Sequence, residues 1–201
     1  MDLEKIKQIS KEYMEKNDGA HGWDHVQRVY NLCVRIGEKE GADLDVLERA
    51  ALLHDVGISE DRKNHEKISA RIARDLLKDY EKVDEVAYCI ECHRFSKDIE
   101  PETIEAMILQ DADRLDVLGA MGIMRTMVFT GHMDRPVHIP GKSPREKYNG
   151  KSETAIHHFY EKLLKVKDTL NTETAREMAS KRHEYMEGFL DEFFAEWDGE
   201  R

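Results

Sequence analysis

The sequence predicts an all-α protein, and three observations lead to that expectation. Apolar residues recur at spacings of three and four along nearly the whole chain, which is the period of a helix with one buried face. No stretch shows the alternation of apolar and polar residues that is typical of a half-buried strand. Proline occurs only four times, and three of the four lie between residues 131 and 150. We therefore expect a helical bundle.

The apolar pattern divides the first two thirds of the chain into successive helices. They are expected at about residues 2–16, 23–41, 44–55, 64–76, 81–93 and 101–128. Asn64 stands where a helix N-cap is expected, because its side chain can accept a hydrogen bond from a backbone N–H of the first turn. The long helix over 101–128 is expected to kink near Gly119 and Gly122.

Residues 131–150 have the composition of a loop, with three prolines and three glycines. Within them Ser143-Pro144-Arg145-Glu146 fits a capping box with proline at the first helical position, which predicts a short helix. Two further helices are expected at about 152–168 and 173–197. The sequence therefore predicts a single domain over residues 1–201: a bundle core of about 18–128, the loop, and the two C-terminal helices packed on the core.

The loop is also locally basic in a chain whose net charge is −11. A Gly/Pro-rich loop with positive charge is suited to close over a polyphosphate, with Lys151 binding a phosphate. A solvated connection between helices has the same composition, and the sequence leaves both interpretations open. The basic residues of this segment are Arg135, Lys142, Arg145, Lys147 and Lys151.

Charge and composition disfavour several classes of protein. A net charge of −11 argues against long contact with a nucleic-acid backbone. No apolar run approaches the roughly 18 residues needed to span a bilayer, and the N-terminal residues lack the apolar core of a secretory signal. Three cysteines are too few for a disulfide framework. We therefore expect a cytoplasmic monomer or homodimer whose partner is a small molecule, not a long nucleic acid or a membrane.

Ligand-type side chains recur on the inward faces of the expected helices. His54 lies on the apolar stripe of its helix, and Asp55 follows at the C-terminal end, where unpaired carbonyls disfavour a carboxylate. Asp113 lies in the apolar row of the long helix, and a buried carboxylate needs a partner. Asp111 lies in a second inward row and is an equal candidate on the pattern alone. Three more imidazoles lie in register with apolar neighbours: His25, His65 and His93.

A divalent cation would explain why these groups point inward from different helices. It would neutralise the two aspartates and remove the penalty on a carboxylate at a helix end. Two imidazoles and two carboxylates leave open positions on a six-coordinate ion. Nitrogen and oxygen ligands together suit Mn²⁺, Fe²⁺, Mg²⁺ or Zn²⁺, with Mn²⁺ and Fe²⁺ slightly favoured.

His25, then His54-Asp55, then Asp113 follow the order of the H…HD…D signature of the HD superfamily of metal-dependent phosphohydrolases. The segments GAHGWDHVQRV, AALLHDVG and QDADRLDVLGAMGI resemble a compact bacterial and archaeal branch of that superfamily, related to nucleoside triphosphate diphosphohydrolases. The resemblance covers about residues 18–128 and continues more loosely to the end. It implies an all-α HD-type fold and one metal held by these four residues, because the family motif places the last ligand at the aspartate directly before an arginine.

The resemblance also implies the reaction: hydrolysis of a nucleoside or deoxynucleoside triphosphate to the monophosphate and pyrophosphate, by a water that the metal activates. Besides Asp55, the expected catalytic residues are Glu66 and Arg28. Glu66 would orient the water, and Arg28 lies one helical turn beyond His25, from where it could reach the same cavity. A solvated Arg28 and a Glu66 that only complements its helix dipole are the alternatives.

His65 and His93 are expected to bind the substrate phosphates as hydrogen-bond donors, and the alternative is that they bind a second metal ion. Two other functions remain open. A paired-iron site of the HD fold could activate dioxygen, with these two histidines completing the site. A metal- or nucleotide-binding sensor without turnover would use the same residues.

Overall fold

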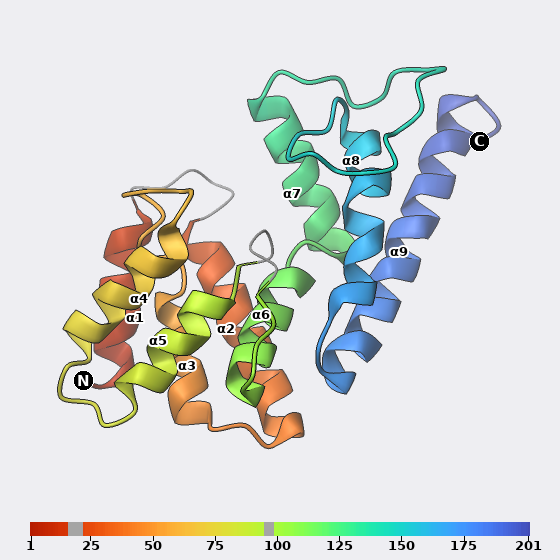
Figure 1. Ribbon diagram of the computed structural model, residues 1–201. Coiled ribbons are helices and arrows are strands. Elements are labelled where there is room, and N and C mark those ends of the chain that lie inside the picture. Colours follow the sequence, from red (N-terminus) through yellow and green to blue (C-terminus); the bar gives the residue numbers. More distant parts are fainter. Residues whose placement is uncertain (16–21, 95–98) are drawn as a thin grey trace. The chain divides into compact units, whose positions relative to one another are not determined.

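The computed structural model describes residues 1–15, 22–94 and 99–201, and every regular element within them is a helix (Figure 1). This confirms the predicted all-α class. The end of the first helix, predicted at residue 16, lies outside the described residues. The elements are α1 (Leu3–Met14), α2 (Trp23–Glu40), α3 (Leu44–Leu53), α4 (His65–Leu76), α5 (Val83–Cys92), α6 (Ile104–Leu115), α7 (Gly119–His132), α8 (Ala155–Glu161), the 3₁₀ helix η2 (Leu163–Thr169) and α9 (Glu173–Trp197).

Local side-chain and backbone chemistry sets several helix ends. Asp43 caps α3 by accepting hydrogen bonds from the backbone N–H groups of Asp45 and Val46 at 3.0 and 3.3 Å. Gly41 ends α2 with a φ of 72°, in the left-handed region that glycine adopts without strain. Asn64 does precede α4, but its side chain donates to Asp61 and makes no cap hydrogen bond.

The described chain packs as two compact units. The first unit comprises Met1–Arg114 and Asn171–Ala175, and the second comprises Leu115–Leu170 and Arg176–Arg201. In the first unit α3 contacts α1, α2, α4 and α5. Seven of the ten residues of α3 are buried, so this helix forms the centre of the unit and carries His54 and Asp55 at its C-terminal end.

The single helix predicted over residues 101–128 is two helices, with the break where the kink was expected. Gly119 begins α7 with a φ of 71°, which an L-residue adopts only with strain. A Cβ at Gly119 would lie 3.1 Å from the Arg182 side chain, and one at Gly122 would lie 2.1 Å from the Val117 carbonyl oxygen. Both glycines therefore permit the tight turn between α6 and α7.

In the second unit, the short helix predicted at Ser143–Glu146 is absent, so that prediction was wrong. The backbone N–H of Arg145 donates to Glu161 Oε1 at 3.0 Å, and its guanidinium pairs with the same carboxylate. This tertiary anchor outweighs the local capping preference. The helix predicted over 152–168 is divided into α8 and η2.

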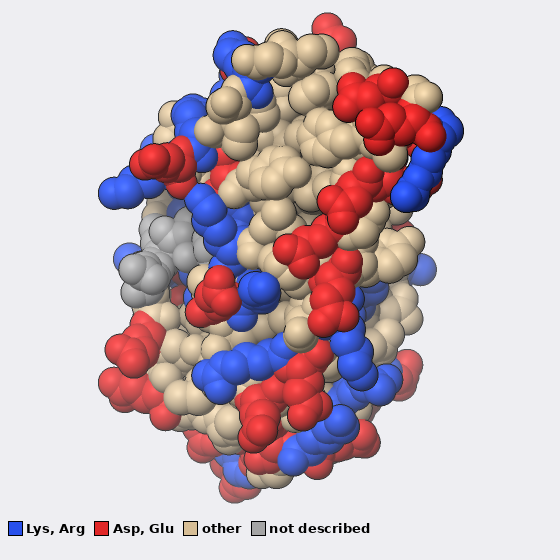
Figure 2. All heavy atoms as spheres, turned by 90° about the vertical axis from the view of Figure 1, so that its right-hand side faces the viewer, with Lys and Arg blue, Asp and Glu red and all other residues tan. Residues whose placement is uncertain are grey.

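None of the helices in the described ranges is long and apolar enough to cross a membrane. The longest, α9, exposes a series of carboxylates, and Figure 2 shows acidic side chains gathered in a column on the face that α9 lines. The exposed acidic residues of α9 include Glu177, Glu184, Glu187, Asp191 and Glu196.

Candidate metal centre

Four histidines and Asp55 meet inside the first unit, each from an end of a helix. His25 lies in the first turn of α2, His54 directly follows α3, His65 begins α4 and His93 directly follows α5. All five side chains are buried, from 0% exposure at His54 to 8% at His65. The structure therefore brings together the histidines that the sequence placed on separate inward faces.

The first group of potential ligands consists of His25, His54 and Asp55. The Nε2 atoms of His25 and His54 lie 3.3 Å apart. Asp55 Oδ2 lies 3.7 Å from His25 Nε2 and 3.6 Å from His54 Nε2. Asp113 approaches the same group, with Oδ1 at 3.3 Å from His25 Nε2.

The second group consists of Asp55, His65 and His93. In this group the contacts are made by the other carboxylate oxygen of Asp55. Oδ1 lies 3.1 Å from His65 Nε2 and 3.5 Å from His93 Nε2. The two Nε2 atoms are 3.2 Å apart. Asp55 thus lies between two histidine pairs, with one oxygen directed at each.

Backbone carbonyls orient three of the imidazoles. The Nδ1 atom of each lies near the carbonyl oxygen three residues earlier in the chain, at 2.8 Å for His54, 3.1 Å for His65 and 2.6 Å for His93. A carbonyl oxygen only accepts, so each Nδ1 carries the proton. In the neutral rings the lone pair is therefore on Nε2, which is the atom that faces the cluster.

These distances fit a divalent metal ion. Donor atoms about 2.1 Å from an ion lie about 3.0 Å apart at octahedral angles and about 3.4 Å apart at tetrahedral angles. The edges of the second group, 3.1 to 3.5 Å, match that range, and those of the first group, 3.3 to 3.7 Å, are slightly wider. The facing lone pairs on the buried Nε2 atoms of His65 and His93 repel each other without a cation between them, so this donor set itself favours one.

The pKa values of the cluster follow from burial and from the two aspartates. Burial lowers the pKa of His54 to about 4, which keeps this ring neutral and able to act as a ligand. Burial also disfavours the charged form of His93, but its hydrogen bond to Asp55 and the Asp55 charge raise the pKa above the usual value. In the charged ring Nε2 carries a proton towards Asp55, and a metal ion would take the place of that proton. The pKa of Asp113 is lowered in spite of burial, because His25 hydrogen-bonds to its carboxylate.

The two aspartates of α6 that the sequence pattern did not distinguish have different surroundings. Asp113 lies at His25, as described above, whereas the Asp111 carboxylate accepts four hydrogen bonds from Asn171 and Thr172. Burial raises the pKa of Asp111, although these hydrogen bonds act against it. Asp113 is therefore the aspartate that reaches the cluster.

Of the other predicted residues in the first unit, Glu66 is buried and its Oε2 lies 3.2 Å from Arg94 Nη1. Arg28 lies on α2 one turn after His25 and is half-buried. Sequence reasoning missed Arg94, which directly follows His93 and pairs with Glu66. Its position next to a candidate ligand was the one available signal.

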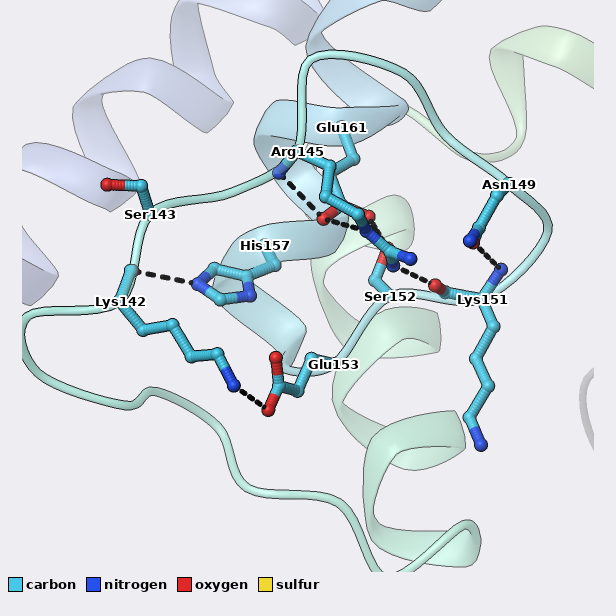
Figure 3. Close-up of a pocket in the computed structure, with 9 residues that line it drawn as sticks. All are labelled: Lys142, Ser143, Arg145, Asn149, Lys151, Ser152, Glu153, His157 and Glu161. Carbon is cyan, nitrogen blue, oxygen red and sulfur yellow. Dashed lines mark hydrogen bonds and ion pairs between the residues drawn. The ribbon is translucent and has the colours of Figure 1, made fainter.

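Lys151 lies in the second unit, where it lines a pocket of about 440 Å³ between the loop and α8. Figure 3 shows that the other cations of this pocket have carboxylate partners: Arg145 pairs with Glu161, and Lys142 pairs with Glu153. The Lys151 side chain extends away from Arg145 in the same view. The pocket therefore offers Lys151 as a cation that is not engaged by a lining carboxylate.

Comparison with known proteins shows which family the chain resembles. Residues 22–118 match the family model of the HD domain. The YpgQ protein of Bacillus subtilis is 36% identical over 195 residues, which cover 93% of this chain and 89% of that protein. Ribonuclease Y of Thermoanaerobacter pseudethanolicus is 33% identical over 112 residues, which cover 56% of this chain and 22% of that protein.

Two solved structures are similar over almost the whole chain. An HD-superfamily hydrolase from Bacillus thuringiensis superposes with a TM-score of 0.79 at 36% identity, covering 98% of this chain and 96% of that chain. B. subtilis YpgQ in complex with ADP superposes with a TM-score of 0.75 at 33% identity, covering 95% and 92%. Together with the buried His/Asp cluster, these similarities show that the chain belongs to the HD-domain phosphohydrolase family, among its small YpgQ-like members.

Proposed function

We propose that this protein hydrolyses nucleoside or deoxynucleoside triphosphates to the monophosphate and pyrophosphate. The observation that carries the proposal is the position of Asp55, with one carboxylate oxygen directed at each of two buried histidine pairs. The nucleotide as substrate class is supported by the similarity to a protein that was crystallised with ADP. The net charge of −11 favours a small substrate over a long nucleic acid.

In this proposal His25, His54, Asp55 and Asp113 hold a divalent ion, with Mn²⁺ or Fe²⁺ favoured over Mg²⁺ and Zn²⁺. When bound, such an ion supplies positive charge to phosphate oxygens and lowers the pKa of a water. The protein orients His54 in advance, because its Nδ1 hydrogen bond to the Ala51 carbonyl oxygen holds the imidazole in place.

We infer that His65, His93 and Asp55 Oδ1 hold a second ion, in preference to the phosphate-donor role that the sequence favours. The reason is that both rings commit their Nδ1 protons to backbone carbonyls, so the neutral rings have no proton left on Nε2 to donate. The triangle of donor atoms also has the size that an ion requires.

Three residues have roles that depend on the substrate. Glu66 would orient the attacking water, and its carboxylate is held in place by Arg94. Arg28, in the first unit, would bind a phosphate oxygen, and Lys151, in the second unit, is a separate candidate for a phosphate contact. The partner is a small phosphorylated molecule, and the protein is a monomer or homodimer.

The test is a screen of purified protein against ribo- and deoxyribonucleoside triphosphates, nucleoside diphosphates and a short RNA, each with Mn²⁺, Fe²⁺, Mg²⁺ or Zn²⁺. We expect metal-dependent release of pyrophosphate from triphosphates. His54→Ala and Asp113→Ala are expected to abolish this turnover while circular dichroism shows that the fold is retained. Release of orthophosphate alone, or turnover of RNA alone, would contradict the proposed substrate.

The same geometry favours a second candidate, a di-iron oxygenase, because a carboxylate shared by two histidine pairs is also suited to two irons. Oxygen consumption by the iron-loaded protein with a small organophosphonate or polyol, without release of phosphate from nucleotides, would favour it. Binding of metal and nucleotide without any turnover would indicate a sensor instead.

A further inference from the structure

A buried hydrogen-bond network joins the middle of α6 to three other parts of the first unit: the end of α5, Ile99 and the segment Asn171–Ala175. Gln110, which is 1% exposed, donates through Nε2 to the carbonyl oxygens of Cys92 and Ile99 at 2.9 and 3.0 Å. Its Oε1 accepts a hydrogen bond from Asn171 Nδ2 at 3.0 Å. The side-chain amide of Gln110 therefore connects all three segments.

Asp111, the next residue, binds the same segment through both of its carboxylate oxygens. Oδ1 accepts from the backbone N–H and the side chain of Asn171 at 2.8 and 2.9 Å. Oδ2 accepts from the backbone N–H and the hydroxyl of Thr172, both at 2.8 Å. The carboxylate is fully buried, and these four bonds compensate the cost of removing it from water.

In sequence, the network includes residues that closely precede two members of the metal centre, His93 and Asp113. Cys92 is the last residue of α5, so its carbonyl oxygen has no hydrogen-bond donor within the helix. Gln110 Nε2 provides that donor, directly before His93 in the chain. Asp111 is two residues before Asp113 on α6. The network thus ties the segment that carries His93 to the helix that carries Asp113.

We propose that Gln110 and Asp111 are positioning residues of the metal centre, which hold His93 and Asp113 at the spacing that the ions need. This inference rests on the proposed metal-dependent function. An apolar pair of similar size could fill the same space without the desolvation cost of a buried carboxylate. A polar network in which every donor and acceptor is paired fixes one relative position of the segments that it joins, whereas apolar packing tolerates several.

The test measures metal affinity directly, by Co²⁺ titration followed by ligand-field absorption and by competition with a chelator. We expect Asp111→Asn and Gln110→Met to weaken Co²⁺ binding about 10- to 100-fold, as the loss of outer-shell partners does at other metal sites. Gln110→Met should act mainly on the second equivalent of ion, because it releases the segment that carries His93. Asn171→Ala keeps the backbone hydrogen bonds to Asp111 and provides a milder variant.

Glu105→Gln is the matched control. Glu105 also lies on α6 and accepts a backbone hydrogen bond, from Asp43 N–H at 2.9 Å, but at the end of the helix away from Asp113. Its Co²⁺ affinity should stay within about twofold of wild type. Unchanged affinity in all three network variants, measured well below their melting temperatures, would overturn the positioning role alone. A wild-type protein that binds no Co²⁺, Mn²⁺ or Fe²⁺ would overturn both this inference and the proposed function.

Discussion

The imidazoles of His65 and His93 meet with their Nε2 atoms 3.2 Å apart, although each ring already donates its Nδ1 proton to a backbone carbonyl. Such a pair is stable when a cation lies between the two lone pairs. We therefore expect two Mn²⁺ ions per wild-type chain and one per His93→Ala chain, measured by elemental analysis of dialysed protein at pH 8. An equal ion content in the two proteins would show that these histidines are not ligands.

The buried carboxylate of Glu161 anchors the loop of the second unit. Ser152 and Arg145 hydrogen-bond to it, and although burial opposes the charge, these bonds lower its pKa to about 2. Glu161→Gln leaves Arg145 without its counter-charge, and the Arg145 side chain is 44% exposed, so water screens part of the loss. We expect a destabilisation of about 2 kcal/mol in urea unfolding.

Lys142→Ala is the comparison for that variant, since Lys142 pairs with Glu153 on the surface of the same pocket. This exposed ion pair should contribute less than about 0.5 kcal/mol. If the two variants lose equal stability, burial of the Glu161 carboxylate does not make its ion pair a stronger anchor of the loop than the exposed pair.

The stability of the second unit should decrease as the pH falls from about 6.5 towards 4. Burial, and secondarily the charge of Lys162, lower the pKa of His158 to about 4, so the unfolded chain binds a proton in this range that the folded chain does not. The stability due to neutral His158 is therefore complete above pH 6.5 and is lost below it. One proton contributes a slope of at most about 1.4 kcal/mol per pH unit.

Urea unfolding between pH 4 and 8 measures this slope, and a His158→Gln variant is the control. The variant should lose less stability than wild type across that range, because its side chain does not titrate. Parallel pH profiles of the two proteins would assign the acid sensitivity to other groups.

Two glycines of the second unit are expected to respond oppositely to alanine. A Cβ at Gly122 would meet the Val117 carbonyl oxygen at 2.1 Å, so the backbone has to move, and we expect a loss of at least about 2 kcal/mol. Gly188 lies within α9, and apart from its chain neighbours and the nearby backbone of its own helix no atom lies within 4 Å of its would-be Cβ, so Gly188→Ala should stabilise by about 0.5 to 1 kcal/mol. Thermal melts of the two variants against wild type check both signs.

Helix periodicity made the all-α class and most helix positions predictable, because each helix of the first unit buries one apolar face. The same periodicity identified His25, His65 and His93 as inward residues before any contact was known. It could not predict how Asp55 divides its two oxygens between the histidine pairs. That arrangement depends on the mutual placement of four helices, which no local pattern encodes.

The failures of sequence reasoning have a common cause in contacts between distant parts of the chain. Asp111 and Asp113 both lie on inward rows of α6, and the donors that bind Asp111 are 60 and 61 residues away. The capping box at Ser143 is locally sound, but Glu161 holds the Arg145 backbone in a non-helical position. Local helix propensity is a weak guide where a buried carboxylate from a distant part of the chain binds the backbone N–H groups of the segment.

The segment Asn171–Ala175 belongs to the first unit, while the residues on both sides of it belong to the second. A fragment that stops at residue 118, where the family match ends, would therefore delete every donor to the Asp111 carboxylate and leave a charge buried without compensation. The unit that holds the candidate metal centre therefore cannot be separated from the rest of the chain by a single cut, because the segment that binds Asp111 would be lost with the C-terminal residues.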